Sequence, residues 1–372
     1  MNSNSIGDLN TPERILLGPG PSMVPPQVLR AMAHPLLGHL DPQFIGLMKE
    51  VQELLRYVFQ TQNELTLPVS GTGSASMEAT IANFLEPDDP ILIVVNGYFG
   101  ERLCDMANRY GAVVHRLDIP WGRVATPEDI EQALRKQRVK VVALVHAETS
   151  TGALTPLDGI ANVVHRYGAL LLVDCVTSLG GIPVNVDQQG IDIAYSATQK
   201  CLSCPPGLGP LTVGENARRV LHDRKTKVPN WYLDLTMIEH YWGDERTYHH
   251  TAPISMNFAL REALRQVQAE GLENRFARHR YNSEQLWQGL EEIGLHCVVP
   301  YEYRLPSLTT VYVPEGVNEV ELRKRLLDEY NIEIAGGLGE FKGKVVRIGL
   351  MGYSSRQENI LLLISALDRL LK

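Results

Sequence analysis

The chain has 372 residues, of which 44% are hydrophobic and 21% are charged, a composition ordinary for a globular protein. Single hydrophobic cores stop growing at about 250–300 residues, so this length predicts one large domain and a smaller one. Basic residues number 35 and acidic residues 43, which gives a net charge of −8 spread along the chain without blocks of one sign. This pattern argues against a nucleic-acid partner and against binding to an anionic membrane surface.

Three features of the sequence bear on the compartment. Residues 1–10 are polar and lack the basic and apolar regions of a secretory signal. The longest aliphatic runs, 91–95 and 169–173, are far shorter than the ~20 residues needed to span a bilayer. The 5 cysteines are an odd number and cannot all pair in disulfides within the chain. Cys104 and Cys175 lie inside apolar runs, as is typical of proteins in a reducing environment. We therefore expect a cytoplasmic protein without a membrane span.

The elements predicted in the first part of the chain alternate between strands and helices. Residues 17–21 are rich in proline and glycine and must be irregular, because proline lacks a backbone donor. The strand candidates are 65–69, 91–96, 113–117, 139–146, 169–174, 191–196 and 210–213, several of them apolar on consecutive residues, as in strands covered on both faces. Helix patterns lie at 100–110, 127–135 and 156–167, the last two with start signals at Thr126 and Thr155. This alternation predicts an α/β fold with a mostly parallel, doubly wound, seven-stranded sheet.

The character of the sequence changes after Glu215. Residues 221–253 are loop-rich and aromatic, and a long amphipathic segment follows at 255–293 with a break at Gly271. The last part reads as an α+β unit with strands at 309–313 and 345–350 and helices at 317–330 and 355–371. We predict an extended N-terminal arm, a large domain and a small C-terminal domain, joined by a long helix near 255–293, with the bounds 1–20, 21–260 and 261–372.

A single lysine, Lys200, follows the strand candidate 191–196 and precedes a loop at 205–210 that is rich in proline and glycine. In open α/β sheets, ligands bind beyond the carboxyl ends of the strands, which is where Lys200 is expected to lie. A lone lysine is ordinarily a surface residue. The end of a second strand favours a functional interpretation instead.

That second strand end is Asp174, which follows a fully apolar run. A carboxylate in this position is costly unless a cation or a hydrogen-bond donor faces it. A pyridinium nitrogen is such a partner, and an aspartate on that nitrogen recurs in sites for pyridoxal 5′-phosphate (PLP). One β-α-β crossover separates Asp174 from Lys200, which places both at one edge of the sheet. The alternative is a structural or helix-capping aspartate.

Glycines and hydroxyl residues at 69–79 follow a strand candidate and open a helix. Free N–H groups and the positive end of the helix dipole would then face a phosphate. The stretch is not a Walker loop, and Ser76 stands where a Rossmann fingerprint has glycine. A helix cap without a ligand is the alternative.

Arg347 lies in the apolar strand candidate 345–350. A buried arginine needs an anion, and its planar fork grips a carboxylate with two hydrogen bonds. A ligand carboxylate and an internal salt bridge both meet this need.

Other polar groups fit a metal or redox site poorly. Cys201 and Cys204 lack the second pair that zinc needs and the usual surroundings of a thioredoxin motif. His249 and His250 do not form a metal set, so we expect no metal.

From residues 17–21 to 347–349 the sequence resembles the class V (fold type I) PLP-dependent aminotransferases, and within them the alanine–glyoxylate and serine–glyoxylate (serine–pyruvate) group. The stretch from Asp192 through Lys200 to Gly209 is similar to the family's cofactor-lysine signature. Residues 172–181 and 248–253 resemble the narrower group. The resemblance implies the PLP-dependent transferase fold of type I.

The same resemblance implies roles for individual residues. Lys200 would be the Schiff-base lysine and Asp174 the partner of the pyridine nitrogen. The phosphate-binding residues it implies are Thr72, Gly73, Ser74 and Gln199, with Tyr248 and Thr251 from the neighbouring subunit. Those implied near the cofactor ring and the substrate are Thr149 at the phenolic oxygen, Phe99 stacked on the ring, and Arg347 at the substrate's α-carboxylate. Phe99 and Ser74 depart from the tryptophan and histidine of some relatives.

The resemblance further implies ping-pong transamination between a small amino acid, alanine or serine, and glyoxylate or another small keto acid. A single well-placed arginine favours monocarboxylic donors. Sites shared between subunits imply a homodimer.

Other readings remain open. A ureidoglycine- or aminophosphonate-type transaminase fits the same scaffold. A cysteine desulfurase would need a reactive cysteine on a mobile loop, and Cys297 lies in a strand-like stretch. A kynureninase-like lyase uses the same scaffold, and a non-catalytic α/β binding protein comes from a different class.

Overall fold

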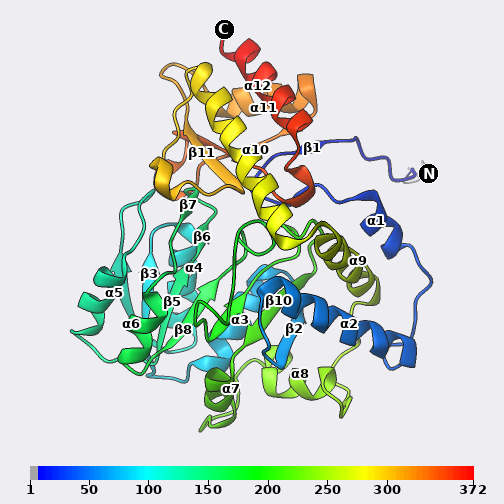
Figure 1. Cartoon of the computed structure of the whole chain (residues 1–372), viewed down its shortest axis with the longest axis vertical. Helices are drawn as coiled ribbons and strands as arrows, with labels where there is room; N and C mark the ends of the chain where they lie inside the picture. The colour runs from blue at the N-terminus through cyan, green and yellow to red at the C-terminus, as the bar shows by residue number, and fades with distance from the viewer. Residues whose placement is uncertain (1–6) are drawn as a thin grey trace, which may run out of the picture.

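The computed structural model describes residues 7–372, so the first six residues of the predicted arm lie outside the described part. Figure 1 shows two stacked units, with most of the strands in the lower one and the C-terminal helices in the upper one. The long helix α10 (Leu272–Glu292) runs from the upper unit down to the lower one. In residues 7–372, no helix is both long and apolar enough to cross a membrane.

The lower unit is built on a seven-stranded sheet with the strand order β2-β10-β9-β8-β5-β3-β4. Its strands are β2 (Leu65–Ser70), β3 (Pro90–Val95), β4 (Val113–Asp118), β5 (Val141–Val145), β8 (Leu170–Asp174), β9 (Ile193–Tyr195) and β10 (Leu208–Val213). Every strand predicted for this sheet is present, and the α/β fold is confirmed. Strands β3, β5 and β8 are almost entirely buried, as their consecutive apolar residues predict.

One strand of the sheet runs against the others. β10 pairs antiparallel with both β2 and β9, whereas the remaining pairs are parallel. An antiparallel neighbour needs no crossover helix, so the loop between β9 and β10 carries Lys200 without leaving this side of the sheet.

The helices of this unit surround the sheet. They are α1 (Pro26–Met32), α2 (Pro42–Phe59), α3 (Gly73–Phe84), α4 (Tyr98–Arg109), α5 (Pro127–Leu134), α6 (Ile160–Arg166), α7 (Glu215–His222), α8 (Leu235–Trp242) and α9 (Ile254–Glu270). The start predicted at Thr126 is confirmed, because Thr126 and Asp129 form a capping box. The start predicted at Thr155 is wrong, because the N–H of Thr155 donates to the carbonyl of His146 and the chain turns at Gly159 (φ 79°) before α6.

The aromatic stretch predicted to be loop-rich is more ordered than expected. It contains the 3-10 turn η1 (Trp231–Leu233) and helix α8, whose Tyr241 and Trp242 are buried. Their aromatic side chains join the core of the lower unit. Burial of these rings therefore stabilises a helix that composition alone did not suggest.

The upper unit has a core of its own. A three-stranded antiparallel sheet, β11-β14-β13, packs against α10 and two further helices, around a separate apolar cluster. These elements are β11 (Leu308–Tyr312), α11 (Glu319–Tyr330), β13 (Ala335–Gly336), β14 (Val345–Gly349) and α12 (Gln357–Leu371). The break predicted at Gly271 is confirmed, since this residue (φ 80°) separates α9 from α10.

The N-terminal segment belongs to the upper unit's core. β1 (Ile15–Leu16) pairs in parallel with β12 (Ile332–Glu333), and the fully buried Leu17 packs in the same apolar cluster. The chain then passes through the irregular residues 18–21 toward the sheet, as their prolines predict. The division into an arm and two domains stays a prediction.

Candidate active site

The carboxyl ends of three neighbouring parallel strands, β5, β8 and β9, meet at one edge of the sheet. Asp174 is the last residue of β8, Lys200 follows β9, and Thr149 follows β5. The shared edge therefore brings together side chains that lie far apart in the sequence, as parallel topology requires.

Lys200 is almost fully buried at this edge. Its Nζ donates to the carbonyl of Pro19 in the irregular N-terminal segment. Gly20 packs against this side chain, and its φ of 111° is a backbone conformation that favours glycine. Burial, and then the charge of Arg347, lower the pKa of Lys200 to about 8. The amine is therefore largely available in its neutral, nucleophilic form at mildly alkaline pH.

Asp174 is equally buried. Its Oδ2 accepts a 2.7 Å hydrogen bond from the hydroxyl of Tyr195, and its Oδ1 accepts one of 2.8 Å from the N–H of Val176. Burial outweighs both bonds and raises the pKa of Asp174 to about 6, although the charges of Lys200 and Arg102 act to lower it. Within residues 7–372 no cation lies within salt-bridge distance, so a bound cation would stabilise this carboxylate.

The glycine-rich turn after β2 presents an anion cradle. Thr72 is the N-cap of α3 but makes no side-chain cap hydrogen bond, and in the described chain the N–H groups of Gly73 and Ser74 have no backbone acceptor. Gly73 packs on Ala197, where an added Cβ would approach to 2.6 Å, so the helix start lies close to the Lys200 loop. Gln199 precedes Lys200 in this loop, and its Oε1 is buried without a hydrogen-bond partner among the described residues. The free N–H groups of Gly73 and Ser74 lie at a helix N-terminus, where phosphate binds favourably.

Phe99 lies in the first turn of α4, and a residue that the sequence interpretation missed lies beside it. The guanidinium of Arg102 is 4.8 Å from the centroid of the Phe99 ring and donates a 3.2 Å hydrogen bond to Oγ of Ser74. The spacing of three residues from Phe99 was a usable signal, because positions i and i+3 share a helix face. Arg102 therefore adds positive charge beside the anion cradle.

A second missed residue is Glu148, which is fully buried between the first turn of α4 and Thr149. Its carboxylate accepts hydrogen bonds from the N–H of Phe99 (3.3 Å) and from the N–H and Oγ of Ser150 (3.0 and 2.6 Å). Burial nevertheless raises its pKa to about 7. The available signal was an acid two residues after the predicted strand 139–146, comparable to Asp174 at the end of its own strand.

Thr149 and Arg347 connect the two units of the molecule. The hydroxyl of Thr149 lies 2.5 Å from that of Thr177, and its carbonyl accepts a 3.1 Å hydrogen bond from Nη1 of Arg347. Nε of Arg347 donates to the carbonyl of Gly336 at 2.8 Å. Burial lowers the pKa of Arg347 to about 10. Among the residues described, no carboxylate pairs with it, so the internal salt bridge considered from the sequence is not formed and the guanidinium keeps capacity for an anion.

Tyr248 and Thr251 are placed differently from the other predicted site residues. Both are exposed, and Tyr248 packs against His39 at a ring distance of 5.2 Å. Between them, the buried His250 contacts Oγ of Ser70 at 2.6 Å, directly before the glycine-rich turn. The two residues therefore lie on the outer surface near the anion cradle.

Comparison with known proteins agrees with this arrangement. The family model of class V aminotransferases matches residues 14–362. The chain belongs to the class V aminotransferase family. The resemblance inferred from the sequence is confirmed, and this class V chain is an aminotransferase with PLP as its cofactor.

Alignments with known relatives cover nearly the whole of this chain. It is 44% identical to the alanine–glyoxylate aminotransferase of Rattus norvegicus, covering 94% of this chain and 86% of that protein. It is 41% identical to the (S)-ureidoglycine–glyoxylate transaminase of Bacillus subtilis (strain 168), covering 98% and 92%. Among solved structures, the alanine–glyoxylate aminotransferase of Nostoc sp. matches with 55% identity, a TM-score of 0.98 and full coverage of both chains. The fold of type I is therefore confirmed.

The residues of the class V site fit PLP on structural grounds. The free N–H groups at the start of α3 suit a phosphate. The buried Asp174 suits a protonated ring nitrogen, and the amine of Lys200 suits an aldehyde.

Proposed function

We propose that this class V aminotransferase moves the amino group of a small monocarboxylic amino acid, alanine or serine, to glyoxylate. The observation that carries the proposal is the buried guanidinium of Arg347, which lies across the site from Lys200 and has no carboxylate within salt-bridge distance among residues 7–372. One such arginine accommodates one carboxylate, which alanine, serine and glyoxylate each carry. The names of the relatives from Rattus norvegicus and Nostoc sp. support alanine as donor and glyoxylate as acceptor.

The chain's own residues divide the work. PLP, when bound, supplies the aldehyde that takes up the amino group and a ring that accepts electrons. The neutral amine of Lys200 holds the cofactor and, once displaced by the substrate, takes the proton from the substrate's Cα. Asp174 keeps the ring nitrogen protonated, with its carboxylate oriented by Tyr195. Phe99 would provide a stacking face for the ring, and Thr149 would contact the edge of the ring.

The phosphate would be held by Thr72, Gly73, Ser74 and Gln199, with Arg102 adding charge beside Ser74. Backbone N–H groups at a helix start hold an anion without counter-charge of their own. Arg347 would hold the substrate's α-carboxylate with two parallel hydrogen bonds, which fixes the Cα–H bond relative to Lys200.

A second candidate donor is (S)-ureidoglycine, because the Bacillus subtilis relative with that donor is nearly as similar. Both kinds of relative are named for glyoxylate, so the acceptor is better supported than the donor. Cysteine desulfurization is disfavoured for two reasons. Burial raises the pKa of Cys297 to about 11, and its backbone forms an antiparallel β-bridge with Val311, so it does not lie on a free loop.

A donor panel tests the proposal. Alanine, serine, (S)-ureidoglycine, glutamate and aspartate are compared by kcat/KM with glyoxylate as acceptor. We expect alanine or serine to exceed glutamate by at least about 100-fold, because a second carboxylate would be buried without a partner. Comparable activity with glutamate contradicts the proposal, and a preference for (S)-ureidoglycine selects the second candidate.

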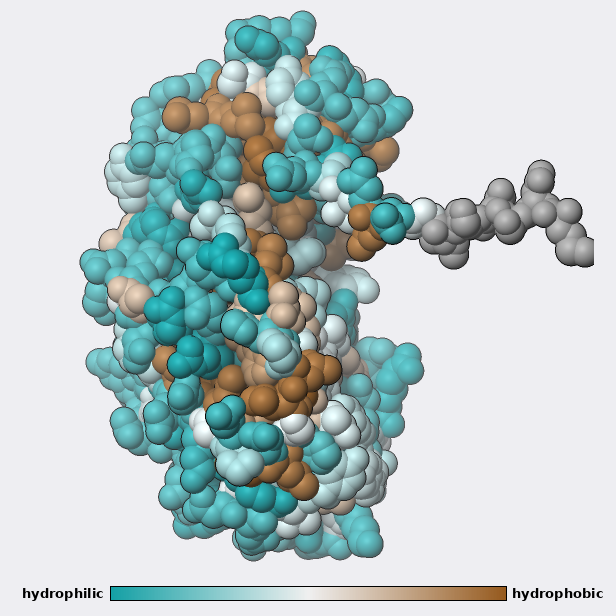
Figure 2. Space-filling view, turned by 90° about the vertical axis from the view of Figure 1, so that its right-hand side faces the viewer, coloured by the Kyte–Doolittle hydropathy of each residue, from teal (hydrophilic) through white to brown (hydrophobic). Residues whose placement is uncertain are grey.

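The exposed Tyr248 and Thr251 support a two-fold dimer in which each subunit completes the partner's phosphate site. Figure 2 shows apolar patches on the face of the molecule that carries α1 and α2. The exposed leucines of this region are Leu29, Leu36 and Leu40. Exposed apolar patches of this kind mark protein interfaces.

Mixing two weak variants tests the shared site. In a hybrid of Lys200→Ala and Tyr248→Phe subunits, one site has an intact lysine and, if Tyr248 acts across the interface, an intact tyrosine from its partner. After the variants are mixed 1:1, unfolded and refolded, half of the dimers should be hybrids with one intact site each, so activity should recover toward about a quarter of that of the wild type. No recovery would place Tyr248 in its own subunit's site and contradict the proposal.

We also propose a cytoplasmic location, supported by five free cysteines, most of them buried. Fractionation of the source cells checks it. Activity in the cytosolic fraction supports the location, and activity in a secreted or membrane fraction contradicts it.

A further inference from the structure

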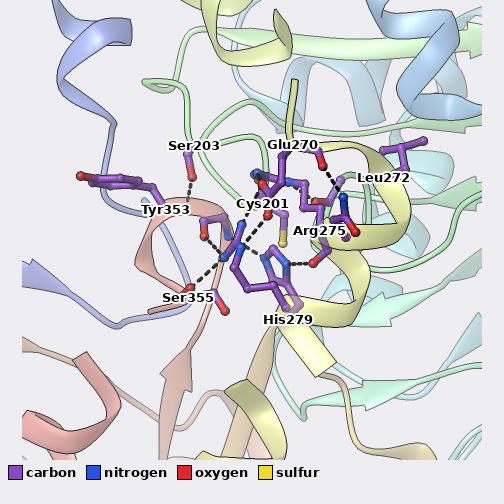
Figure 3. Close-up of polar contacts among 12 residues, drawn as sticks. Cys201, Ser203, Glu270, Leu272, Arg275, His279, Tyr353 and Ser355 are labelled. Atoms are coloured by element: carbon purple, nitrogen blue, oxygen red, sulfur yellow. Dashed lines mark hydrogen bonds and ion pairs between the residues drawn. The ribbon is translucent and has the colours of Figure 1, made fainter. Parts of the chain in front are cut away.

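A buried polar cluster lies at the start of α10, where the two units of the molecule meet (Figure 3). Its centre is Arg275, which is 6% exposed. Nε of Arg275 donates to the carbonyl of Gly180 at 2.7 Å, and Nη2 donates to the carbonyl of Cys201 at 2.5 Å. Nη1 pairs with Glu270 at 2.6 Å. One guanidinium thus holds two loops of the lower unit and the end of α9.

The same cluster holds a turn of the upper unit. Glu270 also pairs with Arg278 at 2.6 Å, and Nη1 of Arg278 donates to the carbonyls of Gly352 (3.0 Å) and Ser355 (2.7 Å). His279 accepts a 2.9 Å hydrogen bond at Nε2 from the N–H of Gly352. Its Nδ1 lies 2.7 Å from the carbonyl of Arg275 and must therefore donate. These contacts fix His279 as the neutral tautomer protonated on Nδ1, and burial lowers its pKa to about 3.

The two loops held by the cluster also touch each other directly. Oγ of Ser203 accepts a 2.7 Å hydrogen bond from the N–H of Tyr353. Gly352 (φ 54°) lies against Ser203 and the carbonyl of Cys201, where an added Cβ would clash with both. On the other side, Oγ of Ser22 donates to the carbonyl of Lys200 at 2.7 Å. The loop after Lys200 is therefore packed between the N-terminal segment and the turn after β14.

The cluster contacts the chain close in sequence to both Lys200 and Arg347. Cys201 directly follows Lys200, and Gly352 follows Arg347 through the end of β14 and residues 350–351. Lys200, proposed to act on the substrate's Cα–H, and Arg347, proposed to hold its carboxylate, are thus each joined by a short, buried backbone segment to a carbonyl or N–H that the cluster binds. The cluster is the link that sets where one group lies relative to the other.

We infer that Arg275 is a positioning residue, which fixes Arg347 relative to Lys200 by holding the loop after Lys200 against the α10 residues that bind the turn after Arg347. The inference rests on the proposed carboxylate-binding role of Arg347. Arginine is suited to the task, because its rigid fork binds two carbonyls and a carboxylate at once, which a lysine ammonium on a flexible stem does not reproduce.

A purely stabilising role is the competing explanation. Burial lowers the pKa of Arg275, and its pairing with Glu270 acts against that shift, so the ion pair offsets a desolvation cost. Buried ion pairs of this kind are weak sources of stability and are better known for fixing one arrangement among several. A displacement of about 1 Å between reacting groups costs up to about 100-fold in rate, so a loosened link should be visible in kinetics.

The experiment compares Arg275→Met with Arg280→Met in the PLP-loaded enzyme. Arg280 is the matched control, because it lies on the same helix with a half-exposed side chain and pairs with Glu284 rather than with the cluster. For Arg275→Met we expect kcat/KM for both amino acid and keto acid to fall about 10–100-fold, mainly through KM. The dissociation constant of PLP should change less than kcat/KM, since only Lys200 among the proposed cofactor-binding groups lies next to the loop that Arg275 holds, and Asp174 and the start of α3 make no contact with the cluster in the described chain. Arg280→Met should change neither quantity.

A physical readout accompanies the kinetics. The N–H groups of Gly352 and Tyr353 are bound to His279 and Ser203, so they should be protected from hydrogen exchange in the wild type. Arg275→Met should accelerate their exchange, and Arg280→Met should not. Arg275→Lys keeps the charge and the bond to Glu270, so it provides the same measurements, with a smaller rise in KM, if the methionine variant does not fold.

Arg347→Met is measured alongside to separate two kinds of failure. If Arg347→Met raises KM for both substrates but the Arg275 variants only lower the melting temperature, the cluster stabilises without positioning and the inference is wrong. If Arg347→Met leaves KM unchanged, the proposed carboxylate site is wrong and the inference fails with it.

Discussion

Asp174 and Tyr195 are direct neighbours at the ends of the parallel strands β8 and β9, and the hydroxyl of Tyr195 donates a 2.7 Å hydrogen bond to Oδ2 of Asp174. The N–H of Val176 donates to the other oxygen at 2.8 Å. Both oxygens are thus oriented before any cofactor arrives. A carboxylate held in this way acts as a prearranged charge rather than one that must reorganise during the reaction.

Asp174→Asn should lower kcat about 10²–10³-fold while leaving the cofactor covalently bound, because the amide lacks the charge that keeps the ring nitrogen protonated. The measurements are kcat and the mass of the pyridoxyl label after borohydride reduction. Asp192→Asn is the control, since Asp192 is also buried but bonds the N–H of Leu171 and His165 away from the site. A loss of kcat equal in both variants would contradict a specific role for Asp174.

Lys200→Ala should lower kcat by about 10⁴-fold, because the variant loses both the covalent anchor and the proton carrier at Cα. Borohydride reduction of the wild type should place a pyridoxyl label on residue 200, which peptide mass spectrometry detects. Lys49→Ala, on the exposed side of α2, should keep both the label and the activity. A label on another lysine in the wild type would overturn the assignment.

Capture of PLP by the cofactor-free protein should depend on pH through Lys200. Burial and Arg347 lower the pKa of this amine from 10.5 to about 8, so its neutral form increases up to that pH and then dominates. The association rate, followed by absorbance, should rise about tenfold per pH unit below 8 and level off above it. Nα-acetyl-lysine is the reference, and its rate with PLP should keep rising toward its pKa of about 10.4. Parallel pH profiles for protein and reference would contradict the prediction.

Stability of the cofactor-free protein should report the burial of Glu148. Its pKa is raised from 4.5 to about 7, so its contribution to stability is fully present below pH 4.5 and is lost as pH rises through 7. The unfolding free energy of the wild type relative to Glu148→Gln should therefore fall by on the order of 3 kcal/mol between pH 5 and pH 8. Urea unfolding measures it, with Glu284→Gln on the surface of α10 as control. A wild-type free energy of unfolding that rises with pH relative to that of Glu148→Gln contradicts this account.

Local patterns were sufficient for much of the architecture. Runs of consecutive apolar residues correctly predicted β3, β5 and β8, because a strand that is covered on both faces has apolar side chains at every position. The same patterns misplaced the start of α6, because Thr155 uses its N–H in a turn with His146 and Gly159 reverses the backbone. A capping motif predicts a helix start only where no tertiary partner competes for the same groups.

The candidate active site likewise contains residues that the sequence identified and residues that it did not. Asp174 and Lys200 could be identified from the sequence because each is a polar residue at the end of an apolar strand. The topology of parallel strands brings such ends together. Arg102 and Glu148 were not identified, since their partners, Ser74 and Phe99, lie in other segments of the chain. The lack of a carboxylate within salt-bridge distance of Arg347 in the described chain was likewise a matter of packing.

By itself, the sequence determined the α/β class, the positions of the strands and the chemical identity of the lysine and aspartate at the sheet edge. The tertiary structure alone decided the antiparallel course of β10, the pairing of β1 with β12 and the cluster around Arg275. The physical reason is the sequence distance over which each kind of interaction acts. Periodicity and side-chain chemistry act within a few residues, whereas these contacts join segments that only the packing of the whole chain brings within a hydrogen bond of each other.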